Sequence, residues 1–426
     1  MTVKNMRRFE NGNQVEYARE RRMAERAVHR ASILTKRAVT LTPSYWASSP
    51  VSPCPSRKLS NGEISKSDAS PVTAADFAAQ ALLISAIHGA FPADSFVGEE
   101  DADSLRQDPL LAIQVFDFVR QYANVKFYPA DGQAVYPDDE EELYTPSSIE
   151  EMLHIIDLGG RGKGGRTGRF WALDPIDGTA TFVKGQQYAV SLALIEEGKE
   201  VVGVLGCPNL KLPEDGSLVT ETSVDHDSVG LLLSAVKGQG AWVRPMGWEG
   251  SKLRVAQPID SLHRHGRTPP KTARNGHMAA GTDAPLKLSD LHFIDSSIST
   301  ATLSDKVHKI AAACGVSSPF TELYSSHVRY IALILGGREA VQVRFPRHSS
   351  QLKKASMCIW DHAGAQLIYA ESRNGNGKVT DLYGKEIDFG TGRKMSGNWG
   401  ILTCDESVHA QLLELVGHML EEEGSR

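Results

Sequence analysis

The nine residues WALDPIDGT at positions 171–179 constrain the fold of this chain more than any other stretch. Apolar residues lead up to Asp174 and predict a short buried strand, with the carboxylate at its C-terminal edge. The proline that follows forces the chain to turn, and Gly178 lets the backbone approach a ligand closely. Asp174 and Asp177 can then point at one place, while the amides of Gly178 and Thr179 face an anion if a helix begins there. The stretch therefore predicts a site where a hard cation and a phosphate meet.

The composition is that of an ordinary globular protein, because 41% of the residues are hydrophobic and 23% are charged. From a length of 426 residues we expect one large domain or two closely packed ones. The net charge of -6 argues against nucleic acid or an anionic membrane as the main partner, and no apolar run is long enough to span a bilayer. Five widely spaced cysteines without a CxxC pair indicate reduced thiols. We expect a cytoplasmic protein and, for its oligomeric state, a monomer.

The arginines near the N-terminus leave two interpretations open. They suit an organellar transit peptide, but glutamates alternate with them, and apolar residues recur at helical spacing between Tyr17 and Leu34. We favour an amphipathic helix over about residues 14–38 that belongs to the fold.

Hydrophobic patterns predict an α+β protein in which strands and helices alternate irregularly. The expected helices cover about 14–38, 77–87, 148–158, 306–313, 328–335 and 361–370. The expected strands cover 96–98, 170–173, 188–195, 201–206, 231–236, 240–243 and 341–345. Two segments rich in proline, serine or glycine, 41–69 and 246–290, are expected to be loop insertions. They leave an N-terminal metal-binding part, 14–245, and a C-terminal part, 291–420, that completes the site.

Three further acidic residues lie at the ends of predicted elements, where side chains from distant parts of the sequence can converge. Asp76 precedes a helix, Glu99 follows a short strand, and Asp361 follows a tryptophan at a helix start. Each also has an interpretation without chemistry: Asp76 and Asp361 can simply begin helices, and Glu99 can be a solvated loop acid. Convergence with the two aspartates of the opening motif would make them parts of one centre.

Glu99, Asp361 and the two aspartates of the opening motif belong to motifs that occur in one order in a known family. The motifs are VGEE at 97–100, DPIDGT at 174–179 and WDHAG at 360–364. Through these three motifs, the chain resembles the magnesium-dependent, lithium-sensitive phosphatases of the inositol monophosphatase superfamily. Within it, the chain is most similar to the 3'(2'),5'-bisphosphate nucleotidases of fungi and plants. That similarity lies in SPVT at 70–73, GRFW at 168–171 and GCPNL at 206–210, and the whole resemblance spans about residues 17–415.

The resemblance implies a layered α-β-α-β-α fold, of the sugar phosphatase type, and a metal-assisted hydrolysis of a phosphomonoester. Glu99, Asp174 and the carbonyl of Ile176 would hold one magnesium ion, and Asp174, Asp177 and Asp361 would hold another. Carboxylate and carbonyl oxygens suit this hard ion. Two such ions can clamp the attacking and leaving oxygens of an in-line displacement. Lithium or sodium would inhibit by occupying a magnesium position.

The resemblance also assigns proton transfer and phosphate binding. Asp76 and Thr179 would form a pair that takes the proton from the attacking water, since a hydroxyl can donate to a carboxylate while it accepts from water. The amides of Gly178 and Thr179 would hold the scissile phosphate.

Substrate contacts are expected from Ser326, Arg329, Arg344 and Asp361, which match nucleotide-binding positions of the family. Arg329 stands where the family usually has lysine, so the charge is kept but the donor geometry differs. A solvated strand arginine is the other interpretation of Arg344. A histidine that contacts the nucleotide in the family has no clear counterpart in SSISTATL at 296–303, which puts the substrate in more doubt than the reaction.

The favoured function is therefore hydrolysis of the 3'-phosphate of adenosine 3',5'-bisphosphate to AMP and phosphate. The same activity on 3'-phosphoadenylyl sulfate would connect the protein to sulfate assimilation and salt tolerance. Two alternatives stay open: an inositol polyphosphate 1-phosphatase, and a catalytically weak nucleotide-binding regulatory protein. The second of these is disfavoured because every expected catalytic and metal-binding side chain is present.

Overall fold

The computed structural model describes residues 16–41, 64–65, 71–125, 128–129, 142–213, 217–248, 252–253, 255–259, 285–296, 303–317, 320–346 and 357–424. Most of the expected loop insertions, 41–69 and 246–290, lies outside these residues. The predicted division into the parts 14–245 and 291–420 stays a prediction.

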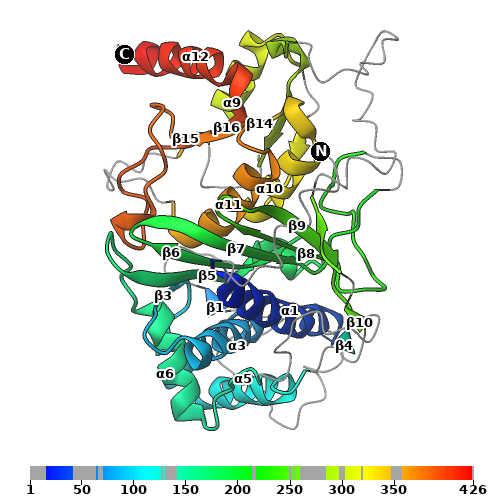
Figure 1. Cartoon of the computed structure of the whole chain (residues 1–426), viewed down its shortest axis with the longest axis vertical. Helices are drawn as coiled ribbons and strands as arrows, with labels where there is room; N and C mark the ends of the chain where they lie inside the picture. The colour runs from blue at the N-terminus through cyan, green and yellow to red at the C-terminus, as the bar shows by residue number, and fades with distance from the viewer. Residues whose placement is uncertain are drawn as a thin grey trace.

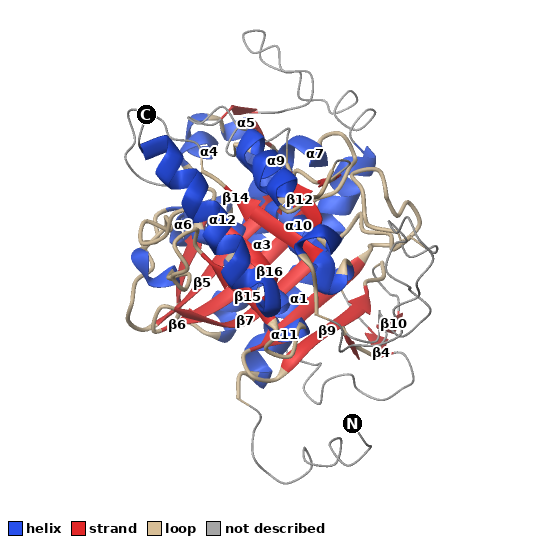
Figure 2. Ribbon diagram, turned by 90° about the horizontal axis from the view of Figure 1, so that it is seen from above, coloured by secondary structure: helices blue, strands red, loops and turns tan. Residues whose placement is uncertain are grey.

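Helices and sheets alternate in five layers, as the resemblance predicts (Figure 1). The first layer holds α1 (Ala18–Leu41) and α3 (Ala74–Ala90), with α5 (Pro109–Gln121) and α6 (Ile149–Gly160) outside them. A seven-stranded sheet follows, then α10 (Ser326–Leu335) and α11 (Ala363–Ser372), then a five-stranded sheet. Helices α9 (Ser304–Ala313) and α12 (Glu406–Gly424) form the last layer and lie over the five-stranded sheet (Figure 2).

The seven-stranded sheet is antiparallel except at one edge, where β3 runs parallel to β5. Its strands in spatial order are β11 (Gln257–Pro258), β9 (Gly240–Pro245), β8 (Leu231–Val236), β7 (Lys199–Cys207), β6 (Ala189–Glu196), β5 (Arg169–Asp177) and β3 (Ser95–Gly98). Strands β6 and β7 are almost continuously apolar because helices cover both faces: α1 contacts them from one side and α11 from the other. The two strands pair as an antiparallel hairpin.

The five-stranded sheet is mixed. Its order is β13 (Thr321–Glu322), β12 (His292–Asp295), β14 (Ala340–Arg344), β16 (Ile401–Asp405) and β15 (Gly377–Thr380). The first three strands are parallel, and β16 is antiparallel to both of its neighbours. Two minor pairs complete the described strands: β1 (Ile64–Ser65) with β2 (Pro71–Val72), and β4 (Tyr128–Pro129) with β10 (Lys252–Leu253).

The helices before the large sheet agree only in part with the predicted elements. Helix α1 confirms the predicted N-terminal helix. Helix α3 is apolar all round and buried on nearly every face, because it lies between α1, α5, α6 and the sheet. Helices α4 (Asp103–Gln107) and α5 were not among the predicted elements. None of the described helices is long and apolar enough to cross a membrane.

Helix α11 lies unusually close to the seven-stranded sheet. A Cβ atom added to Gly203 on β7 would lie 2.5 Å from the carbonyl oxygen of Gly364, so only glycine fits there. This contact holds the first turn of α11, and the residues just before it, against the sheet.

Candidate metal and phosphate site

Three carboxylates from two distant segments meet between the sheets. The oxygens of Asp174, Asp177 and Asp361 lie within 4.8 Å of one another. The first two lie at the end of β5, and Asp361 lies in the turn η4 (Ile359–Asp361) that precedes α11. Asp174 and Asp177 are buried. An all-oxygen set of this kind fits a hard divalent cation such as magnesium.

The electrostatics of this cluster favour a cation. Burial, together with the charges of Asp177 and Glu99, raises the pKa of the Asp361 carboxyl to about 7. Arg344 and Lys394 act in the opposite direction, but they do not cancel the effect. Several carboxylates of like charge in one place are what a divalent ion stabilises.

Glu99 stands beside this group rather than within it. It follows β3, whose Gly98 pairs with Leu173 of β5, so Glu99 lies next to the start of the motif. Among the described residues, the group whose ligand atoms meet consists of the three aspartates and does not include Glu99. The ligand roles of Glu99 and of the Ile176 carbonyl stay predictions.

The strand that carries the motif is longer than predicted. The predicted end at Leu173 is wrong, because β5 continues to Asp177 and pairs there with Ala189 of β6. Its register shifts between Asp174 and Asp177, and this irregularity accommodates the proline between them. The shift brings the two carboxylates together at the cluster.

Gly178 makes the sharp turn after the strand. Its φ of 96° is left-handed, and a Cβ there would lie 3.1 Å from the Cβ of Ser325. The helix that follows, α7 (Thr179–Phe182), has only four residues. Glycine is therefore required both by the backbone and by the close approach of the segment before α10.

Thr179 and Asp76 meet as the resemblance predicts. The Oγ1 atom of Thr179 lies 3.3 Å from Oδ1 of Asp76 and 3.1 Å from the carbonyl oxygen of Ile176. The other oxygen of Asp76 accepts from the amide and hydroxyl of Thr73, at 2.8 and 2.7 Å. Asp76 thus begins α3 by a capping box and also faces Thr179, while its role in proton transfer stays a prediction.

Asp177 also accepts hydrogen bonds from the residues at the start of α10, a contact that the sequence did not reveal. Its carboxylate accepts from the backbone amides of Ser326 at 3.3 Å and His327 at 2.7 Å, and from the hydroxyl of Ser325. Ser325 is also the N-cap of α10 and accepts from the amide of Val328. The only sequence signal for Ser325 was a serine just before a predicted helix.

The predicted substrate residues of the C-terminal part come together next to Asp177. Nη2 of Arg329 and Nη1 of Arg344 both donate to Oγ of Ser326, at 3.0 and 3.3 Å. All three side chains are buried, so the interpretation of Arg344 as a solvated strand arginine is wrong. Burial and the charge of Arg344 lower the pKa of Arg329 to about 10. Two guanidinium groups held on one oxygen atom form a site that suits an anion.

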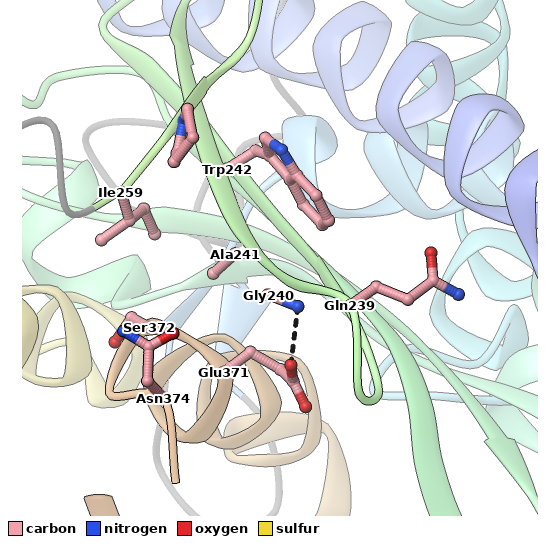
Figure 3. Close-up of a pocket in the computed structure, with 9 residues that line it drawn as sticks. Gln239, Gly240, Ala241, Trp242, Ile259, Glu371, Ser372 and Asn374 are labelled. Atoms are coloured by element: carbon pink, nitrogen blue, oxygen red, sulfur yellow. Dashed lines mark hydrogen bonds between the residues drawn. The ribbon is translucent and has the colours of Figure 1, made fainter. Parts of the chain in front are cut away.

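A cavity lies away from this site (Figure 3). It has a volume of about 210 Å³ between the β8–β9 hairpin and the C-terminal end of α11, the end opposite to Asp361. Its one ionisable lining residue, Glu371, accepts from the amides of Gly238 and Gly240 at 2.7 and 2.8 Å. The Glu371 carboxylate joins the hairpin to the helix, so among the described residues that line the cavity its one ionisable group has a structural role.

Comparisons with known proteins show the family of this chain. Residues 140–418 match the sequence profile of the Inositol monophosphatase family. A 3'(2'),5'-bisphosphate nucleotidase of Emericella nidulans is 33% identical over 95% of this chain and 99% of its own length. One from Oryza sativa is 34% identical over 86% of this chain and 88% of its own length. An inositol monophosphatase structure from Anabaena covers 95% of this chain and 97% of its own, at 13% identity and a TM-score of 0.47. On the profile and the sequence relatives, the chain belongs to the inositol monophosphatase family.

Proposed function

We propose that this chain is a magnesium-dependent 3'(2'),5'-bisphosphate nucleotidase. It hydrolyses the 3'-phosphate of adenosine 3',5'-bisphosphate to give AMP and phosphate. The observation that carries the proposal is the pair of adjacent charged sites of opposite sign. The amide of Ser326 contacts Asp177, while the hydroxyl of the same residue accepts from Arg329 and Arg344. A substrate with two phosphates can place one at each site.

Each residue then has a defined task. Asp174, Asp177 and Asp361, with Glu99 and the carbonyl of Ile176, hold magnesium. When bound, magnesium supplies positive charge for the phosphate and makes water a better nucleophile. In the same assignment Asp76 and Thr179 accept the proton of the attacking water, and the amides of Gly178 and Thr179 orient the scissile phosphate.

The second phosphate is assigned to the C-terminal part. Ser326, Arg329 and Arg344 bind it, because two buried guanidinium groups gain most from a dianion that both can reach. A buried anion site of this kind gives specificity, since a substrate without the second phosphate leaves both cations uncompensated.

The wider role follows from the substrate. The enzyme also removes the 3'-phosphate of 3'-phosphoadenylyl sulfate, and acts as a cytoplasmic monomer in sulfate assimilation. Lithium and sodium compete for a magnesium position, so the activity limits salt tolerance. The names of the fungal and plant relatives support the reaction, and the acidic cluster supports the need for a cation.

A phosphate-release assay tests the proposal. Purified protein is given adenosine 3',5'-bisphosphate, 3'-phosphoadenylyl sulfate or inositol 1,4-bisphosphate, with and without magnesium and lithium. We expect magnesium-dependent, lithium-inhibited release from both nucleotides at micromolar concentration. Release from the inositol substrate alone would make the chain an inositol polyphosphate 1-phosphatase. No release from any of them would make it a binding protein on a phosphatase scaffold.

A further inference from the structure

His362 links the acidic cluster to the arginine pair. It directly follows Asp361, and only 2% of its surface is exposed. Its Nε2 atom lies 3.0 Å from Nη1 of Arg344. A guanidinium group can only donate, so Nε2 must accept and the proton of the neutral ring must sit on Nδ1.

This arrangement concerns one ring nitrogen of His362 only, and the other has no hydrogen bond in the described part of the chain. Nδ1 of His362 is buried and has no hydrogen-bond partner among the residues that the structure describes. A buried donor without a partner costs stability, and an apolar ring would avoid that cost. The edge of Tyr330 packs against the ring with centroids 6.2 Å apart, a contact that phenylalanine would also make. Packing alone therefore gives no reason for histidine at this position, whereas the acceptor at Nε2 does.

The contact fixes how Arg344 presents its remaining donors. Nη1 of Arg344 is held between Oγ of Ser326 and Nε2 of His362. Nε of the same guanidinium has no partner in the described part of the chain. The Nε donor of Arg344 is thus left for an anion, and a guanidinium that adds a second donor to Nε can bind phosphate in a bidentate manner.

We propose that His362 is a positioning residue that orients Arg344 toward the phosphate that is not hydrolysed. It thereby sets the preference for bisphosphates over monophosphates. The inference rests on the proposed nucleotidase function. His362 touches neither the scissile phosphate nor the attacking water in this assignment, and it acts through Arg344.

Steady-state kinetics with two substrates test the role. The readout is the ratio of kcat/KM for adenosine 3',5'-bisphosphate to that for 3'-AMP, which lacks the second phosphate. In His362→Phe we expect this ratio to fall about tenfold, mainly through KM, since a hydrogen bond to a charged group is lost. His362→Gln keeps an acceptor and should retain most of the preference. In the Arg344→Gln background, His362→Phe should change the ratio no further.

A matched control is His409→Phe. His409 is also buried and also uses Nε2, which lies 2.8 Å from Oγ1 of Thr380 in the five-stranded sheet. Its replacement should lower the melting temperature and leave the ratio unchanged. An equal fall in both histidine variants would overturn the positioning role.

The outcomes separate the two proposals. If the wild-type protein does not hydrolyse the bisphosphate, the nucleotidase function fails. If Arg344→Gln loses the preference while His362→Phe keeps it, only the role of His362 fails. Nitrogen NMR of labelled histidine in the wild-type protein needs no variant. It should show an unprotonated Nε2 at His362, and a protonated Nε2 would overturn the inference even if a variant does not fold.

Discussion

The backbone amide of His327 donates to the carboxylate of Asp177 across 2.7 Å. This bond joins the end of β5 to the first turn of α10, and Ser325 and Ser326 reinforce it. A negative charge at a helix N-terminus is stabilised by the helix dipole. The same carboxylate belongs to the acidic cluster, so one side chain both caps the helix of the anion site and faces the proposed cation.

Replacement of Asp177 by asparagine should therefore have two effects. Activity should be abolished, because a ligand charge is lost with little change in volume. The amide NH2 of asparagine would also face the donors at the start of α10, so we expect a destabilisation of about 1 to 2 kcal/mol. Urea unfolding of the metal-free protein measures the second effect. Near wild-type turnover at saturating magnesium would contradict the ligand role.

Asp361→Asn is the matched comparison. It removes a charge from the same cluster, but at a carboxyl whose pKa is raised by burial and by its acidic neighbours. Turnover should again be lost, while the metal-free protein should be as stable as the wild type or more stable at pH 8. A loss of stability like that of Asp177→Asn would show that repulsion among the carboxylates does not destabilise the metal-free protein.

Thr179→Val should lower kcat by about a hundredfold or more, because it removes the hydroxyl between Asp76 and the carbonyl of Ile176 while keeping the shape of the side chain. Thr179→Ser keeps the hydroxyl and should retain most of the activity. Single-turnover phosphate release would compare the three proteins. Equal rates for the valine and serine variants would exclude Thr179 from proton transfer.

The acidic motifs could be read from the sequence because their residue types and order already point to a cation site. The contacts between them could not. Ser325 and Asp177 are brought together only by the packing of α10 against β5, and no local pattern records that meeting. The end of the strand at Leu173 was misplaced for a related reason, since a proline usually ends a strand unless a register shift accommodates it. Burial of Arg344 likewise depends on the helices above β14 and not on its own neighbours in the chain.

Arg30 should be a large contributor to stability. It is fully buried on α1, and burial lowers its pKa to about 9. Its guanidinium donates to the carbonyl of Leu82 at 2.7 Å and to Oγ1 of Thr145 at 3.0 Å, and it also reaches the carbonyls of Ala123, Leu143 and Tyr144. Arg30→Met leaves these acceptors unsatisfied, so we expect a loss of about 3 kcal/mol or more.

Urea unfolding would measure the effect, with Arg120→Met as the control. Arg120 lies exposed on α5, and its replacement should change stability by no more than about 0.5 kcal/mol. Similar unfolding midpoints for the two variants would mean that Arg30 does not hold α1, α3 and the segment near Thr145 together.

Glu200 predicts a pH dependence of stability. Burial raises the pKa of its carboxyl from 4.5 to about 7, although the amide of Gln366 donates to it. A raised folded pKa means that the neutral form stabilises the fold. That contribution is complete below pH 4.5 and is lost as the pH rises through 7. Glu200→Gln stays neutral, so it should match the wild type near pH 4.5 and exceed it by about 1 to 3 kcal/mol at pH 8.

Unfolding curves at the two pH values would show the difference, and Glu414→Gln on the exposed face of α12 should show none. An offset between wild type and Glu200→Gln that is the same at both pH values would exclude titration of Glu200 as its cause.

The distance along the chain between the members of the acidic cluster matters during synthesis. Asp174 and Asp177 are translated well before Asp361, which follows them by more than 180 residues. A nascent chain folds its N-terminal part first and therefore carries two converging aspartates without the third. Under the proposed function, such a chain lacks one residue of the proposed metal site and should not release phosphate. A fragment that ends before residue 361 should be inert for the same reason.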